Sequence, residues 1–179
     1  MYTIKTLNNI SQNGLKRLPA ERYRIVDELA GADAVLVRSA DMHTLDIPAS
    51  VLAIARAGAG TNNIPVTAMS KRGVPVFNAP GANANAVKEL VLAGMLLAAR
   101  NICQAWNFVE HLKEDGAALD KAVEGGKKTY VGFELPGRTL GVIGLGAIGV
   151  QVANAAVGLG MRVVGFDPQV TVERAWQLS

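Results

Sequence analysis

The sequence is poor in cysteine: its 179 residues contain one, Cys103. A single cysteine cannot form an internal disulfide or a cysteine cluster around zinc or iron and sulfur, so the sequence gives no reason to expect an oxidising compartment. The first residues also lack the charged and apolar regions of a secretory signal. We therefore expect a cytoplasmic protein.

Long hydrophobic runs and a large excess of one charge are missing too. The longest apolar run, residues 90–99, has ten residues, whereas a membrane-spanning helix needs about 18 or more. The net charge is only +3, and its excess lies before Gly81. Nucleic-acid surfaces carry a stripe of basic side chains with aromatic ones between them, and no such stripe is visible. We expect no membrane or nucleic-acid partner; a small anionic ligand fits better.

Hydrophobic residues make up 50% of the chain, which is ample material for a folded core. Up to Pro80, short apolar runs alternate with helical stretches, a pattern typical of βαβ units and a parallel sheet. Ligands bind beyond the carboxyl ends of such strands, so the loops at 38–40, 58–63 and 78–81 are expected to converge on one site. The predicted strands are Tyr2–Leu7, Ala34–Val37, Val51–Ala57 and Val74–Phe77, and the predicted helices are Ala20–Leu29 and Pro65–Lys71.

A long segment without proline, residues 85–112, is predicted to be one helix. Its apolar positions surround the helix axis over 90–99, which indicates burial on most sides. Such a helix belongs either in the core of a single domain or between two domains or subunits. Cys103 is expected to be a small buried hydrophobic side chain within it. The polar segment 113–128 that follows is predicted to be an exposed loop.

The glycine motif G-x-G-x-x-G occurs at Gly144, Gly146 and Gly149, between a buried strand (140–145) and a helical stretch (150–158). In such a motif the first glycine permits a tight turn, the second lets a pyrophosphate approach the backbone, and the third lets the helix pack close to the strand. The phosphates then face the positive end of the helix dipole and its free N–H groups.

Asp167 turns this weak glycine signal into a strong one. It follows a second strand, Arg162–Phe166, and lies 18 residues beyond Gly149, close to the spacing of about 20 that is typical of dinucleotide-binding folds. A carboxylate there accepts hydrogen bonds from the ribose hydroxyls and repels a 2′-phosphate. The sequence therefore predicts NAD rather than NADP.

Candidate anion contacts lie in the first part of the chain. Arg38 ends an apolar strand and Ser39 adds a hydroxyl, and a planar guanidinium at that place suits a phosphate or carboxylate. Arg56 lies within its strand and is expected to be structural. Gly60 allows backbone N–H groups to face an anion. Asn83 either contacts the ligand or caps the following helix.

Histidine and metal chemistry are not expected. His43 and His111 are 68 residues apart, and neither has a carboxylate or serine partner in a motif. No residue group has the spacing of a metal site.

Together these motifs make the sequence resemble the D-isomer-specific 2-hydroxyacid dehydrogenases, over nearly the whole chain. Two of the shared segments, 37–40 and 56–63, resemble most the branch of that family that acts on D-3-phosphoglycerate. The segments that carry the resemblance are 37–40, 56–63, 75–80, 88–90, 137–149 and 165–168.

The resemblance implies an α/β fold: a flavodoxin-like parallel-sheet substrate domain, 1–82, followed by an incomplete Rossmann NAD-binding domain, 83–179. The reaction implied is hydride transfer between NAD and C2 of 3-phosphoglycerate, a small anionic 2-hydroxy acid. The helix over 85–112 would carry the subunit contact, because the family forms dimers and tetramers.

The resemblance also implies roles for individual residues. Arg38, Ser39, Gly60 and Asn83 would contact substrate, with the Gly60 amide on its carboxylate. The residues implied in cofactor binding are Ala59 near the nicotinamide, Gly144, Gly146 and Gly149 in the turn, Ala147 and Ile148 at the pyrophosphate, and Asp167 at the ribose.

One departure from the family concerns catalysis. The family's catalytic Arg, Glu and His lie in the second half of the nucleotide domain, so no residue of this chain is implied as catalytic. We therefore expect an incomplete portion, truncated after its second Rossmann strand and inactive alone, with the region after about Pro136 mobile, swapped or paired with another copy. The alternatives are a dehydrogenase of glyoxylate, hydroxypyruvate or lactate, and a non-enzymatic NAD-responsive binding protein.

Overall fold

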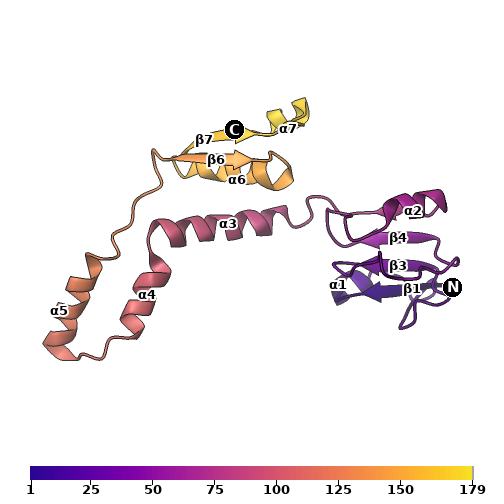
Figure 1. Cartoon of the computed structure of the whole chain (residues 1–179), viewed down its shortest axis with the longest axis horizontal. Helices are drawn as coiled ribbons and strands as arrows, with labels where there is room; N and C mark the ends of the chain where they lie inside the picture. The colour runs from indigo at the N-terminus through magenta and orange to yellow at the C-terminus, as the bar shows by residue number, and fades with distance from the viewer. Residues whose placement is uncertain (179) are drawn as a thin grey trace. The chain divides into compact units, whose positions relative to one another are not determined.

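The computed structural model describes residues 1–178 and divides the chain into two compact units, Met1–Ala82 and the part that begins at Asn83 (Figure 1). Each unit has its own parallel sheet. The protein therefore has an α/β fold. None of the helices in residues 1–178 combines the length and hydropathy needed to cross a membrane.

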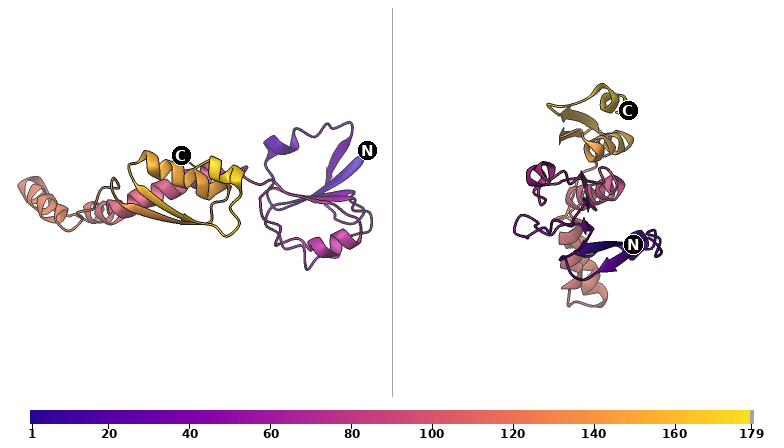
Figure 2. Two further views of the ribbon diagram at one scale, coloured as in Figure 1. Left: turned by 90° about the horizontal axis from the view of Figure 1, so that it is seen from above. Right: turned by 90° about the vertical axis from the view of Figure 1, so that its right-hand side faces the viewer.

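The first unit is a five-stranded parallel sheet in the order β2-β1-β3-β4-β5, the flavodoxin-like order. From β1 the chain crosses to β2 at one edge of the sheet, and from β3 it continues through β4 to β5 at the other edge. Right-handed crossovers in these two directions place α1 and α2 on opposite faces of the sheet (Figure 2). The elements are β1 Tyr2–Leu7, α1 Gln12–Leu15, β2 Tyr23–Val26, β3 Ala34–Val37, β4 Ala53–Arg56, α2 Val66–Lys71 and β5 Val76–Phe77.

The core of this unit lies around the two central strands β3 and β4. Val35, Val37 and Ile54 are fully buried and alternate along these strands, as period-2 side-chain geometry requires. Met42, which follows β3, and Met69, in α2, pack against these side chains. Because β3 and β4 lie in this core, the positions of their carboxyl ends, where the candidate anion-binding loops begin, are fixed.

The predicted helix over Ala20–Leu29 is wrong. Its middle forms the edge strand β2, which pairs with β1 from Tyr2 opposite Tyr23 to Lys5 opposite Val26. The rings of Tyr2 and Tyr23 stack with centroids 6.2 Å apart. Pairing with an open sheet edge, supported by this aromatic cross-strand pair, overrides the local helical pattern.

The second unit has α6 between the helix α3 and a two-stranded parallel sheet, β6-β7 (Figure 1). Ala156 of α6 is fully buried in a cluster with Ala99, Leu135 and Met161, and Val150 and Ala153 pack with Val142 against the sheet. The elements are α3 Ala84–Ala99, α4 Ile102–Glu110, α5 Gly116–Lys127, β6 Thr139–Ile143, α6 Ala147–Gly158, β7 Arg162–Phe166 and α7 Val172–Trp176.

The single helix predicted over 85–112 is wrong: two helices, α3 and α4, replace it. Asn101 takes a left-handed backbone conformation, with φ of 51°, which no α-helix can continue through. The Ala99 carbonyl then accepts the Phe133 N–H at 2.8 Å, and the Asn101 side chain donates to the Val131 carbonyl at 3.2 Å. The Phe133 N–H therefore satisfies the Ala99 carbonyl at the end of α3, and the Asn101 side chain binds the same segment.

Three further expectations in this region are wrong. Residues 113–128 contain the helix α5 rather than a loop. Cys103 is exposed, not buried. Leu90, in the middle of the apolar run, is 74% exposed in this chain. The apolar run surrounds the axis of α3, but α6 covers it only on one side.

Candidate functional site

Hydrogen bonds join the loops that follow β3, β4 and β5. The Arg56 side chain donates from Nε to the Arg38 carbonyl, 2.9 Å away, and from its terminal nitrogen to the Gly60 carbonyl. Asn78 donates through Nδ2 to the Ala59 carbonyl at 2.6 Å. The three loops converge as predicted, and Arg56 has the structural role expected of it.

Arg38 and Ser39 lie at the carboxyl end of β3 with exposed side chains. Within residues 1–178, neither side chain has a hydrogen bond or ion pair of its own. Beside Arg38 is a cavity of about 460 Å³, lined by Asn9, Ile10, Ser11, Gln12, Arg38 and Ala57. An exposed guanidinium over a cavity of this size has room for a small anion and has donors ready for it.

Gly60 lies in the same region, in a conformation held by Arg56. A Cβ built on Gly60 would lie 2.7 Å from the terminal nitrogen of Arg56 and 3.2 Å from the Asn62 Oδ1. The Gly60 N–H donates no hydrogen bond within the described residues. It is therefore open to a ligand carboxylate, and Ala59 beside it is also exposed.

Asn83 immediately precedes α3, at its N-cap position. Its side chain makes no capping hydrogen bond, although its carbonyl accepts the Val87 N–H at 3.0 Å. The capping alternative for Asn83 is therefore not supported. A ligand contact through Asn83 stays a prediction.

The glycine turn of the second unit has the geometry that its motif predicts. Gly144 has φ of 94°, which side chains rarely tolerate, and its N–H donates to the Phe166 carbonyl at 2.7 Å. A Cβ on Gly149 would lie 1.9 Å from the Gly144 carbonyl oxygen. By contrast, a Cβ on Gly146 would meet nothing within 4 Å. The space above Gly146 is open, as close approach of a diphosphate requires.

The N-terminus of α6 faces this open space. The helix begins at Ala147, Gly146 supplies no side-chain cap, and Ile148 is partly exposed. The first N–H groups of a helix have no partner within the helix. The N–H groups of Ala147, Ile148 and Gly149 therefore have no partner within the helix and lie at the positive end of its dipole, where an anion is favoured. Pyrophosphate binding there stays a prediction.

Asp167 lies at the tip of β7 next to the glycine turn. Its Oδ2 accepts the Leu145 N–H and its Oδ1 accepts the Gln169 N–H, both at 2.8 Å. The Asp167 carboxylate therefore ties the tip of β7 to the glycine turn. A ribose contact through Asp167 stays a prediction.

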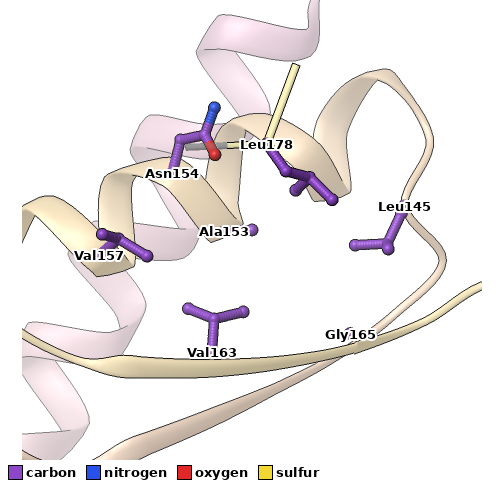
Figure 3. Close-up of a pocket in the computed structure, with 7 residues that line it drawn as sticks. All are labelled: Leu145, Ala153, Asn154, Val157, Val163, Gly165 and Leu178. Carbon is purple, nitrogen blue, oxygen red and sulfur yellow. The ribbon is translucent and has the colours of Figure 1, made fainter. Parts of the chain in front are cut away.

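The second unit has a cavity of about 290 Å³ between α6 and β7 (Figure 3). It is lined by Leu145, Ala153, Asn154, Val157, Val163, Gly165 and Leu178. Its lining carries no charged side chain and includes none of the predicted site residues. The cavity therefore belongs to the packing between helix and strand rather than to an anion site.

The sequence alone did not identify three asparagines as residues that hold the loops of this site. Asn8, Asn63 and Asn78 each hydrogen-bond the backbone of a loop at this edge of the first sheet. The sequence signal for Asn8 and Asn78 is an asparagine placed directly after a strand.

His43 lies among the same loops, with its Nε2 3.1 Å from the Asn62 carbonyl. Within residues 1–178, no group of three His, Cys, Asp or Glu is placed to hold a metal ion.

The chain belongs to the D-isomer specific 2-hydroxyacid dehydrogenases: the family model for their catalytic domain matches residues 2–173. The chain is also similar to two curated relatives and to one solved structure. A D-3-phosphoglycerate dehydrogenase of Archaeoglobus fulgidus is 36% identical over 98% of this chain and 32% of its own length. A hydroxypyruvate reductase of Thermotoga maritima is 40% identical over 83% of this chain and 45% of its own.

The solved structure is a 3-phosphoglycerate dehydrogenase of Entamoeba histolytica with bound NAD+. It is 27% identical to this chain, with a TM-score of 0.67, over 97% of this chain and 56% of its own. The chain thus spans about a third of the length of the Archaeoglobus relative and little more than half of the Entamoeba structure.

Proposed function

We propose that this chain supplies substrate and cofactor contacts of an NAD-dependent dehydrogenase that oxidises D-3-phosphoglycerate at C2 to 3-phosphohydroxypyruvate, a step of serine biosynthesis. The observation that carries the proposal is the glycine turn in front of α6, with Asp167 bonded to it through the Leu145 N–H. The similarity to D-3-phosphoglycerate dehydrogenases supports the choice of substrate.

The cofactor contacts follow from charge and space. Gly146 leaves room for the diphosphate against the backbone, and the N–H groups of Ala147 and Ile148 donate to it. Asp167 accepts hydrogen bonds from the ribose hydroxyls and repels a 2′-phosphate. Bound NAD supplies the hydride acceptor. The chain's own residues bind and orient it.

Three of the four proposed substrate contacts lie on the first unit. Arg38 and Ser39 offer a guanidinium and a hydroxyl to one anionic group, and the Gly60 N–H offers a donor to the carboxylate. Because its side chain has no hydrogen bond or ion pair within residues 1–178, Arg38 loses no protein contact when it binds. Asn83 adds a further contact from the start of α3.

A second candidate function is the reduction of hydroxypyruvate or a related 2-oxo acid. The 40% identity to the Thermotoga hydroxypyruvate reductase favours it. The two candidates differ in the distal group, which is a phosphate in one and a neutral hydroxyl in the other.

We also propose that the chain associates with a second copy through α3 and α4. Both helices expose large apolar side chains that this chain does not cover: Leu90, Val91, Leu96, Leu97, Ile102, Trp106 and Val109. A run of exposed apolar side chains of this extent is typical of an interaction surface.

The substrate assignment is tested with Arg38→Ala. Losing a charge-assisted contact should weaken 3-phosphoglycerate binding to the chain by about 10- to 100-fold, measured by calorimetry, and leave NAD binding unchanged. Arg24→Ala, which removes the same charge from the edge strand β2, is the matched control and should change neither. Equal losses for 3-phosphoglycerate and NAD, or none in Arg38→Ala, would contradict the assignment. An equal loss for hydroxypyruvate would favour the second candidate.

A further inference from the structure

Asn8 holds the backbone of the segment that presents Arg38 and Ser39. It follows β1 directly, and its Oδ1 accepts two hydrogen bonds, from the Ser39 N–H at 2.9 Å and the Ala40 N–H at 2.5 Å. A carbonyl-type oxygen has two lone pairs, so one asparagine satisfies both donors. This contact links residues that are about thirty positions apart in the sequence.

The backbone of Asn8 is in the left-handed region, with φ of 68°. That conformation is unfavourable for residues with a Cβ and is tolerated best by glycine and asparagine. Among residues 1–178, only Asn8 and Asn101 combine a side chain with positive φ. With this left-handed turn directly after β1, the Asn8 Oδ1 meets the Ser39 and Ala40 N–H groups beyond the end of β3.

The rest of the anion segment, which we define as residues 38–40, is held from two other places. Asn63 donates from Nδ2 to the Ala40 carbonyl at 2.8 Å, and Arg56 donates from Nε to the Arg38 carbonyl at 2.9 Å. Four backbone groups of three consecutive residues are therefore fixed by side chains. The side chains of Arg38 and Ser39 themselves stay exposed.

This arrangement has an energetic consequence for binding. Ordering a flexible loop costs free energy when a ligand arrives, and a loop that is already ordered avoids that cost. Fixing the backbone while the guanidinium and hydroxyl stay available is the arrangement expected of a preorganised anion contact.

We propose that Asn8 is a positioning residue for the anion segment: it sets the backbone from which Arg38 and Ser39 reach the substrate, without touching the substrate. The inference rests on the proposed role of Arg38 and Ser39 as substrate contacts. Asn8 lies outside the glycine motif and outside the loops at 38–40, 58–63 and 78–81, so the inference adds a new residue to the proposed substrate site.

Asn8→Gly is the deciding variant. Glycine adopts the left-handed backbone freely, so this change deletes the acceptor and leaves the turn possible. We expect 3-phosphoglycerate binding to weaken about tenfold in calorimetry below the unfolding temperature, with NAD binding unchanged. The matched control is Asn101→Gly, the same exchange at the other left-handed asparagine, whose side chain donates to the Val131 carbonyl. It should leave 3-phosphoglycerate binding unchanged.

Asn8→Asp provides a readout that needs no ligand. A carboxylate oxygen still accepts the two N–H groups, so hydrogen exchange at the Ser39 and Ala40 amides should stay as slow as in the unchanged chain. In Asn8→Gly the same two amides should exchange about tenfold faster.

The outcomes separate the two proposals. If Arg38→Ala weakens 3-phosphoglycerate binding while Asn8→Gly changes neither that binding nor the two amides, the positioning role is wrong and the proposed function stands. Equal effects of Asn8→Gly and Asn101→Gly would mean general destabilisation and would also overturn it. If Arg38→Ala has no effect on 3-phosphoglycerate, the proposed substrate site fails and the role of Asn8 fails with it.

Discussion

The carboxylate of Asp167 is part of the glycine turn as well as the proposed ribose contact. Because it accepts the Leu145 N–H, replacing it would loosen the turn in addition to removing a cofactor contact. At the scale of single residues, the proposed site of the second unit thus contains groups that also hold its backbone in place. Gly149 is another example: because it has no Cβ, the Gly144 carbonyl oxygen can occupy its position in the turn.

Gly149→Ala should destabilise the protein by about 2–3 kcal/mol and weaken NAD binding, because the new Cβ would overlap a backbone carbonyl that cannot move cheaply. Urea unfolding and calorimetry measure the two effects. Gly158→Ala, at the other end of the same helix, is the control. Its Cβ meets nothing within 4 Å, so it should be neutral or stabilise by up to about 1 kcal/mol. A Gly149→Ala chain as stable as the original would contradict this.

Asp33 gives the first unit a pH dependence. The Thr3 backbone N–H, 2.6 Å from Oδ2, and the Thr3 hydroxyl, 2.8 Å away, lower the pKa of the Asp33 carboxylate. A lowered pKa in the folded state adds stability that is present above the unfolded-state pKa, about 3.9, and is lost as pH falls through the folded-state value.

Asp33→Asn removes the charge and keeps the shape of the side chain. The original chain should unfold at a higher temperature than Asp33→Asn at pH 7, and the gap should shrink as the pH is lowered below about 4. Thermal unfolding followed by circular dichroism at several pH values measures it. A gap that is constant down to pH 2 would show that the charge of Asp33 contributes nothing.

At the scale of elements, the break between α3 and α4 separates two helices that both expose large apolar side chains. The left-handed conformation of Asn101 breaks the helix. The Ala99 carbonyl and the Asn101 side chain then form hydrogen bonds with residues 131–133. A Cβ on Gly132 would lie 2.2 Å from the Ala99 carbonyl, so only glycine permits this close passage. Leu90 on α3 and Trp106 on α4 remain 74% and 62% exposed.

Replacing Leu90 and Trp106 together by lysine should weaken self-association of the chain, since two charges would be buried in the proposed contact between copies. Sedimentation velocity over a range of concentrations measures the dissociation constant. Leu52→Lys, at a comparably exposed leucine of the first unit, should leave association unchanged. A chain that sediments as a monomer at every concentration would rule out the contact.

At the scale of the whole molecule, most of the proposed substrate residues and most of the proposed cofactor residues fall in different compact units. Arg38, Ser39 and Gly60 belong to the first, whereas the glycine turn and Asp167 belong to the second; Ala59 and Asn83 are the two exceptions. Each unit holds its own strands and core. Binding of the two ligands is therefore expected to stabilise different parts of the chain.

NAD at about 100 times its dissociation constant should add about 2.7 kcal/mol to the stability of the second unit. Hydrogen exchange should slow most at 144–149 and 167. NADP should bind more weakly, because Asp167 repels its 2′-phosphate. Exchange measured by mass spectrometry with each nucleotide tests this. Equal protection by NADP, or protection greatest in β1–β5, would contradict the placement of the cofactor.

The sequence by itself determined the features that depend on neighbouring residues. Strands 2–7, 34–37 and 162–166 have the predicted bounds, because short apolar runs between polar or glycine-rich segments set them locally. The glycine turn was predictable because φ at Gly144 and the free N–H groups of α6 need only a short segment. Arg38, Ser39, Gly60 and Asp167 were found as candidates for the same reason: each follows or lies close to the end of a strand.

Only the tertiary structure decided the rest. Residues 20–29 hold an edge strand because β1 offers an unpaired edge. The helix over 85–112 divides at Asn101, where residues 131–133 bond to the Ala99 carbonyl and to the Asn101 side chain. Asn8 reaches Ser39 and Ala40 across about thirty positions of sequence. Contacts over such separations depend on which strands become neighbours, and no local pattern of residues encodes that.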